Sequence, residues 1–211
     1  MSKHAALTVA CLSGFAIMVL EIVGMRLLAR DFGSSFYVWT SQIGVVLVAL
    51  TAGYVAGGHW ADRFPGPRVP ALFLAPAGLF TMFIPDFAGP VLRALVDRHP
   101  ADYEIPLLWQ KLDPALGAAL IFLPPCFVLA ILPPFLIRLS ARDVGQVGRT
   151  SGAVVGAGSG GSIAGVFLSG YLLMDLLTLP QILRGTGILI LGLSAFCAWS
   201  SSRFGRSSIP S

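Results

Sequence analysis

The stretch "SGAVVGAGSGGSIAGVFLSGYLL", residues 151–173, is apolar, contains no charged residue and is rich in glycine. Within it, Gly156, Gly158 and Gly161 form a G-x-G-x-x-G pattern, which in many enzymes opens a dinucleotide-binding helix. Such a site also needs a preceding strand and an acidic residue about 20 positions further on. Here the nearest downstream acid is Asp175, only 14 residues after Gly161, and no βαβ pattern surrounds the motif. We therefore expect no nucleotide cofactor.

The same glycines fit a second role, because small residues four positions apart allow two membrane helices to approach closely. Two such rows occur in this stretch, and a third lies upstream. They are Gly152, Gly156 and Gly160; Gly161, Gly165 and Ser169; and Ala49, Gly53 and Gly57. We interpret all three rows as helix-packing faces inside a membrane protein.

Composition supports this interpretation. Of the 211 residues, 55% are hydrophobic and 11% are charged, whereas a soluble domain carries roughly 25% charged residues. About 20 apolar residues are needed to cross a bilayer. The sequence predicts an all-α polytopic bundle of six such helices in one domain, 1–200, followed by a short tail, 201–211. The expected spans are 5–28, 37–60, 69–87, 114–137, 151–173 and 179–199.

Metal and nucleic-acid sites are not expected. The three cysteines and three histidines have no metal-ligand spacing. The net charge of +4 is explained by basic loops that face anionic lipid.

Ionisable residues inside a span usually mark function. Glu21 lies well inside the first span, where a charge costs roughly 2.5–3.5 kcal/mol on insertion scales. Arg26 is a poor partner for it, since residues five apart lie about 140° apart around a helix. We expect Glu21 to bind a cation, relay protons or bond a neighbouring helix. Arg26 and Asp175 are further candidates for a substrate or proton site.

The segment "GGHWADRFPGPR", residues 57–68, ends the second span in a tight turn. Asp62, followed by Arg63, is placed to accept hydrogen bonds from backbone amides or from an arginine of a neighbouring loop. This segment resembles the Gly-x-x-x-Asp-Arg loop between helices 2 and 3 of the major facilitator superfamily.

A closer resemblance covers nearly the whole chain. The order Ser13-Gly14-Phe15, Glu21, Arg26, Gly33-Ser34-Ser35, then a glycine-rich helix ending in Asp62-Arg63, resembles the membrane domain of spermidine-synthase-like membrane proteins. Later, "AILPPFLIRL" (130–139) and "GSGGSIAGVFLSGYLL" (158–173) resemble the fourth and fifth helices of that family.

Two departures limit what this resemblance implies. The Asn-Thr-x-Gly of the family's fifth helix is replaced by Gly158-Ser159-Gly160-Gly161, and we expect no aminopropyltransferase-like soluble domain after the last span. We expect no enzymatic activity from this chain. The resemblance instead implies a transporter, or a membrane anchor for a separate cytosolic aminopropyltransferase-like partner. Two alternatives remain: a half-size transporter that forms a homodimer, and an accessory subunit of a larger membrane complex held through its glycine faces.

Lysine and arginine residues predict the orientation, because they concentrate in cytoplasmic loops. The basic residues favour both termini inside, in a bacterial inner membrane. On that topology, the inside segments hold Lys3, Arg63, Arg68, Arg138, Arg142, Arg149, Arg203 and Arg206, and the outside segments hold Arg30, Arg93, Arg98, Lys111 and Arg184.

Reporter fusions test this topology. A fusion at Ser211 should report a cytoplasmic location, and one within residues 97–104 an external location. A cytoplasmic signal from the second fusion would contradict the six-span arrangement.

Overall fold

The computed structural model describes residues 3–64, 66, 68–99, 105–140 and 147–204, which form helices and no strand. The long helices are α1 (Lys3–Phe32), α2 (Phe36–Arg63), α3 (Arg68–Val96), α4 (Leu107–Ser140), α5 (Val147–Leu168) and α7 (Leu179–Phe204). A π-helical turn, η2 (Ser169–Leu173), and the short α6 (Met174–Leu176) connect α5 to α7. Gly33 turns the chain between α1 and α2 with a φ of +78°, a conformation that suits glycine.

The predicted all-α polytopic bundle is confirmed. Six helical segments are long and apolar enough to cross a bilayer, with the η2 and α6 turns continuing the α5 span. The ends differ from expectation: α3 continues to Val96, α4 begins at Leu107, and α7 passes residue 200 to reach Phe204. The ends differ because hydropathy locates the first polar residues after an apolar run, whereas the helix itself continues past those residues. The rest of the predicted tail, 205–211, lies outside the described residues.

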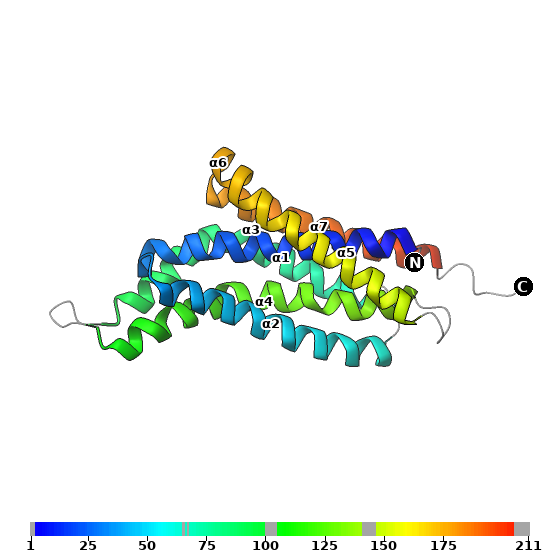
Figure 1. Ribbon diagram of the computed structural model, residues 1–211, viewed down its shortest axis with the longest axis horizontal. Coiled ribbons are helices and arrows are strands. Elements are labelled where there is room, and N and C mark those ends of the chain that lie inside the picture. The colour runs from blue at the N-terminus through cyan, green and yellow to red at the C-terminus, as the bar shows by residue number, and fades with distance from the viewer. Residues whose placement is uncertain (1–2, 65, 67, 100–104, 141–146, 205–211) are drawn as a thin grey trace, which may run out of the picture.

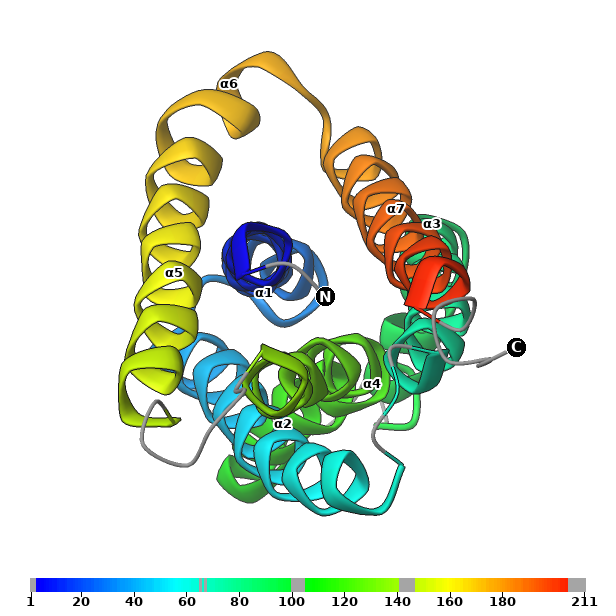
Figure 2. The same cartoon turned by 90° about the vertical axis from the view of Figure 1, so that its right-hand side faces the viewer.

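α1 occupies the centre of the bundle, with the other helices around it (Figure 2). In the most apolar window of each helix, 56% of residues are buried in both α1 and α4, but only 17% in the span that begins with α5. α5 therefore packs chiefly on α1 and leaves most of its surface to lipid or to a partner. The two termini lie at the same end of the bundle (Figure 1). We call it the terminal end, and the opposite end, where α1 meets α2, the distal end.

Glycines hold two of the helix pairs at short distance. A Cβ atom added to Gly53 of α2 would lie 2.5 Å from the carbonyl oxygen of Phe127 in α4. One added to Gly57 would lie 2.8 Å from the backbone of Ile131. On the other side of the bundle, Gly78 of α3 and Gly187 of α7 face each other's carbonyl oxygens at 3.0 and 2.8 Å by the same measure. The predicted packing role of Gly53 and Gly57 is confirmed.

The two glycine rows of α5 behave differently. Gly161 is buried against the backbone of Cys11, and a Cβ atom on Gly165 would lie 2.7 Å from the carbonyl oxygen of Phe15. Gly156 and Gly160 face open space within 4 Å, so no described helix of this chain packs on them, and their predicted packing role stays a prediction about contact with another chain. The two rows are offset by one residue, about 100° around α5, so only one of them faces α1.

The G-x-G-x-x-G pattern lies within the same helix. Gly156, Gly158 and Gly161 all lie inside α5, well after its first turn at Val147. Their backbone N–H groups are used in the helix, so they do not form a phosphate-binding loop at the end of a strand.

Two matched substitutions separate the rows. Gly161→Leu should push α5 away from α1 and destabilise the fold by about 1–3 kcal/mol or more, as overpacking does. Gly156→Leu, with no neighbour to displace, should leave the Tm of the purified protein in detergent close to that of wild type. Equal losses in both variants would contradict the observed packing.

Candidate functional site

Glu21 lies in the middle of α1 and is partly buried. No residue that the structure describes forms a hydrogen bond or an ion pair with its carboxylate. Its neighbour three positions on, Gly24, is buried and faces Gln42 of α2 and Phe122 of α4. Residues three apart share a helix side. Glu21 therefore stands on the side of α1 that faces α2 and α4.

Gln42 is the second polar group of this region and was not anticipated from the sequence. Its side chain is 0% exposed, and neither Nε2 nor Oε1 has a hydrogen-bond partner among the described residues. A buried amide in that state costs about 1–3 kcal/mol for each unmade bond. The side chain of Gln42 packs against Gly24 of α1, where the absence of a Cβ atom leaves room for it. A glutamine inside an apolar span was the available sequence signal.

The third group is the Cys126 thiol of α4, which is fully buried and lies within electrostatic reach of Glu21. Three helices thus bring a carboxylate, an amide and a thiol to one junction. We call these three residues, Glu21, Gln42 and Cys126, the central polar site.

A groove lies on the terminal side of this site, and its lining reaches Ile17 and Met18 of α1 but includes none of the three residues of the central polar site. Its volume is about 310 Å³, and it lies between α1, α2, α4 and α5. Ile17, one turn before Glu21, lines it together with Gly14. Hydroxyl groups from three helices also line the groove, those of Ser13, Tyr54, Ser159 and Ser162.

The chemistry of the central polar site favours a cation. A carboxylate offers only acceptors, and an amide oxygen offers another. Acceptors without protein donors inside a membrane suit an ammonium group, a proton or a water molecule that carries one. The apolar and hydroxyl-bearing walls of the groove fit the methylene chain and nitrogen atoms of an aliphatic amine.

The other two predicted site residues lie elsewhere. Arg26 forms no ion pair with Glu21 and instead lines a cavity at the distal end, together with Met174 and Leu179. Asp175 is exposed on α6 and is not among the residues that line that cavity. The structure therefore does not unite Glu21, Arg26 and Asp175 in one site.

The motif at the end of α2 makes the expected type of contact. Arg138 at the end of α4 approaches the Asp62 carboxylate at 3.5 Å, linking the two helices at the terminal end. Both side chains are mostly exposed, and such pairs contribute little to stability. Arg63 lies over the ring of Phe64, 5.7 Å from its centroid.

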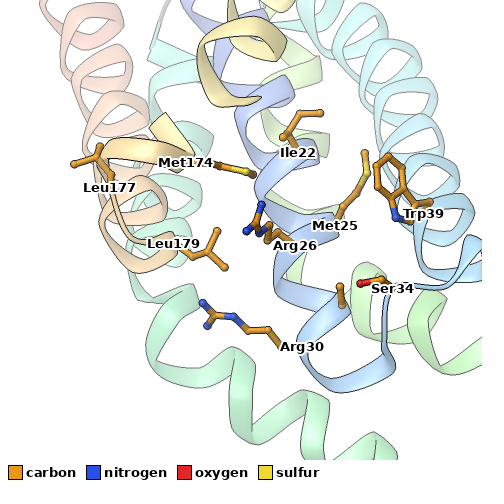
Figure 3. A pocket seen from close by; sticks show the side chains of 10 residues that line it. Ile22, Met25, Arg26, Arg30, Ser34, Trp39, Met174, Leu177 and Leu179 are labelled. Atoms are coloured by element: carbon orange, nitrogen blue, oxygen red, sulfur yellow. The ribbon is translucent and has the colours of Figure 1, made fainter. Parts of the chain in front are cut away.

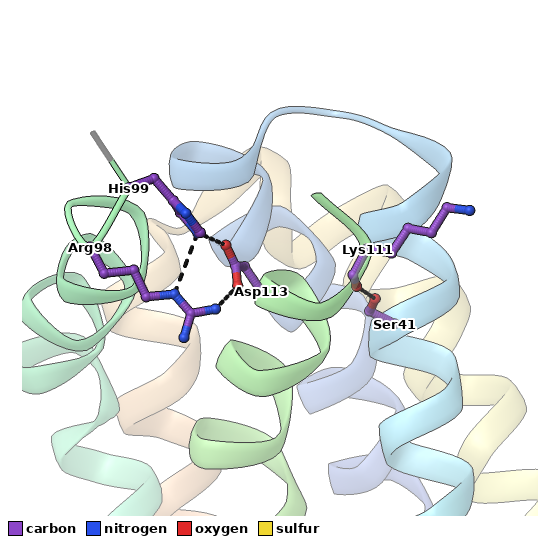
Figure 4. A network of polar contacts seen from close by, with 5 residues as sticks. All are labelled: Ser41, Arg98, His99, Lys111 and Asp113. Atoms are coloured by element: carbon purple, nitrogen blue, oxygen red, sulfur yellow. Dashed lines mark hydrogen bonds and ion pairs between the residues drawn. The ribbon is translucent and has the colours of Figure 1, made fainter. Parts of the chain in front are cut away.

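A stronger ionic cluster, missed in the sequence, closes the distal end (Figure 4). Asp113, buried near the start of α4, accepts a hydrogen bond from Arg98 and another from His99 Nε2 at 2.7 Å. The guanidinium of Arg98 also lies 4.3 Å from the ring centroid of Trp109. The residues are far enough apart in sequence, on two sides of a loop, that spacing alone gave no sign of the cluster.

Comparisons of the chain with protein-family models, with curated proteins and with solved structures find no match. The resemblance to spermidine-synthase-like membrane proteins stays a prediction.

The ionic cluster gives a stability prediction. Asp113→Asn removes the charge that Arg98 and His99 share and should cost about 2 kcal/mol, the scale of a hydrogen bond to a charged group. Asp86→Asn is the matched control, because it breaks the Asp86–Arg184 pair at 3.1 Å, in which both side chains are about half exposed. Thermal unfolding in detergent should show a lower Tm for Asp113→Asn than for Asp86→Asn. The reverse order would show that the cluster does not hold α3 to α4.

Proposed function

We propose that this chain is the membrane transport component of a spermidine-synthase-like system and that it carries a small amine cation. The observation that supports the proposal is a pair of polar groups on facing helices inside the span, Glu21 and Gln42, for which the described part of the chain provides no hydrogen-bond or ion-pair partner. A membrane protein has no stability reason to keep both, since each costs free energy when its bonds are unmade.

The groove supports an elongated substrate. Its lining begins at Ile17 and Met18, about one turn before Glu21, and continues toward the terminal end, so an amine bound at Glu21 would reach it by extending its chain past Ile17. A polyamine fits a carboxylate followed by a groove with hydroxyl groups, because one ammonium group would bind Glu21 and its further nitrogens would lie near those hydroxyl groups. The resemblance to the spermidine-synthase-like family points to the same chemical class.

A cytosolic partner forms the second part of the proposal and rests on the resemblance alone. On the predicted topology the terminal end faces the cytoplasm, where a separate aminopropyltransferase-like protein would meet the groove. The exposed Asp62 and Arg63 lie at that end.

Glu21→Gln tests the transport role. The substitution removes the charge but keeps size and hydrogen-bonding ability. Because no described arginine or lysine pairs with Glu21, the Tm should stay near that of wild type. Uptake of labelled spermidine into proteoliposomes should fall about tenfold or more, as expected when a charged hydrogen bond is lost.

Two further variants sharpen the result. Asp175→Asn also removes one carboxylate, from an exposed position, and should leave uptake unchanged. Gln42→Leu removes a buried unpaired amide, so it should keep or raise the Tm while reducing uptake. A large drop in Tm for Glu21→Gln, or equal uptake by all variants, would count against the proposal.

A second function, as an accessory subunit or as half of a homodimer, is favoured by one observation. Gly152, Gly156 and Gly160 form a row on α5 that no part of the described chain covers. Such a row is suited to a helix of another membrane subunit. Gly156→Leu distinguishes this function from a monomeric transporter, because it should release a co-purifying subunit without lowering the Tm of the chain itself.

A further inference from the structure

A cavity at the distal end carries two basic side chains. Its volume is about 700 Å³, and it lies between the end of α1, the start of α2 and the connection from α6 to α7. Arg26, Arg30 and Ser34 supply its polar groups, and Met25, Trp39 and Leu179 belong to its apolar wall. Figure 3 shows both guanidinium groups extending from α1 toward the side on which Leu179 lies.

The two arginines reinforce each other. They are four residues apart on α1 and so share one face of the helix. None of the residues that line the cavity is acidic, and no described carboxylate forms an ion pair with either arginine. By contrast, Arg98, Arg138 and Arg184 each have an aspartate partner. Because no carboxylate in the described ranges pairs with them, these two neighbouring positive charges favour the binding of an anion.

The position of the cavity across the membrane indicates which environment the anion would meet. α1 has 30 residues, which at ~1.5 Å per residue exceeds the ~30 Å hydrocarbon layer. Arg26 and Arg30 belong to its last two turns and therefore lie near the head-group region. The apolar wall around them suits an acyl or other hydrocarbon chain.

We propose that this cavity binds a phosphate group through Arg26 and Arg30. Arginine pairs with phosphate in bidentate fashion, which gives geometric specificity as well as attraction. The phosphate belongs either to an anionic phospholipid, whose chain then lies along Met25 and Leu179, or to a free phosphate ion. The site is separate from the central polar site and does not depend on the proposed transport.

Native mass spectrometry of the purified wild-type protein tests the lipid source. Phosphatidylglycerol should be retained at least tenfold more than phosphatidylcholine, whose choline group offsets the phosphate charge. Arg26→Gln and Arg30→Gln should each weaken phosphatidylglycerol retention about tenfold. Arg93→Gln is the matched control, because it removes an exposed charge at the same end of the bundle but outside the cavity.

A thermal-shift measurement tests the free ion. If sodium phosphate raises the Tm of wild type and of Arg93→Gln, but not of Arg26→Gln, the proposal holds with phosphate itself as the ligand. Equal retention of the two lipids by wild type, together with no effect of phosphate, would overturn the proposal without any variant. The proposal would also be overturned if the Arg26→Gln and Arg30→Gln proteins retained phosphatidylglycerol to the same extent as the Arg93→Gln protein.

Discussion

Close contact between helix backbones at glycine is the constraint on which the bundle depends. Lipid is as apolar as leucine, so helices in a membrane gain little from burying hydrophobic surface and rely on van der Waals contact. Gly161 on Cys11, Gly57 on Ile131 and Gly78 on Gly187 provide that contact for three helix pairs. α1 belongs to the first of these pairs and lies at the centre of the bundle (Figure 2), so the packing of the surrounding helices determines what its polar residues face.

A glycine on α1 also determines where a buried polar side chain fits. Gly24 opens space on α1 that the side chain of Gln42 enters, and this same side of the helix carries Glu21. A larger residue at position 24 would displace Gln42 and fill the junction with apolar atoms. The bundle instead retains a carboxylate and an amide that no described residue pairs with, an arrangement that local stability alone does not explain.

The sequence predicts the fold well, because apolar runs of bilayer length have few alternative structures. It also predicts that Gly53, Gly57, Gly161 and Gly165 pack against other helices. The sequence does not show which of two glycine rows on α5 meets α1, since both rows have the same spacing. The same limitation applies to Asp113, whose partners Arg98 and His99 come from another helix end. Interactions between distant segments depend on helix orientation, and a one-dimensional pattern does not contain it.

Charge is distributed unevenly along α1, and this distribution connects the two proposed sites. Glu21 lies in mid-span, while Arg26 and Arg30 lie between it and the distal surface. An amine that approaches from the distal end meets two positive charges, whereas the groove toward the terminal end has no charged residue in its lining. A phosphate bound by the two arginines would neutralise that end of the path. Repulsion between like charges strengthens as the dielectric constant falls, so under the proposed function the uncharged terminal-side groove is the approach to Glu21 that repels a cation less.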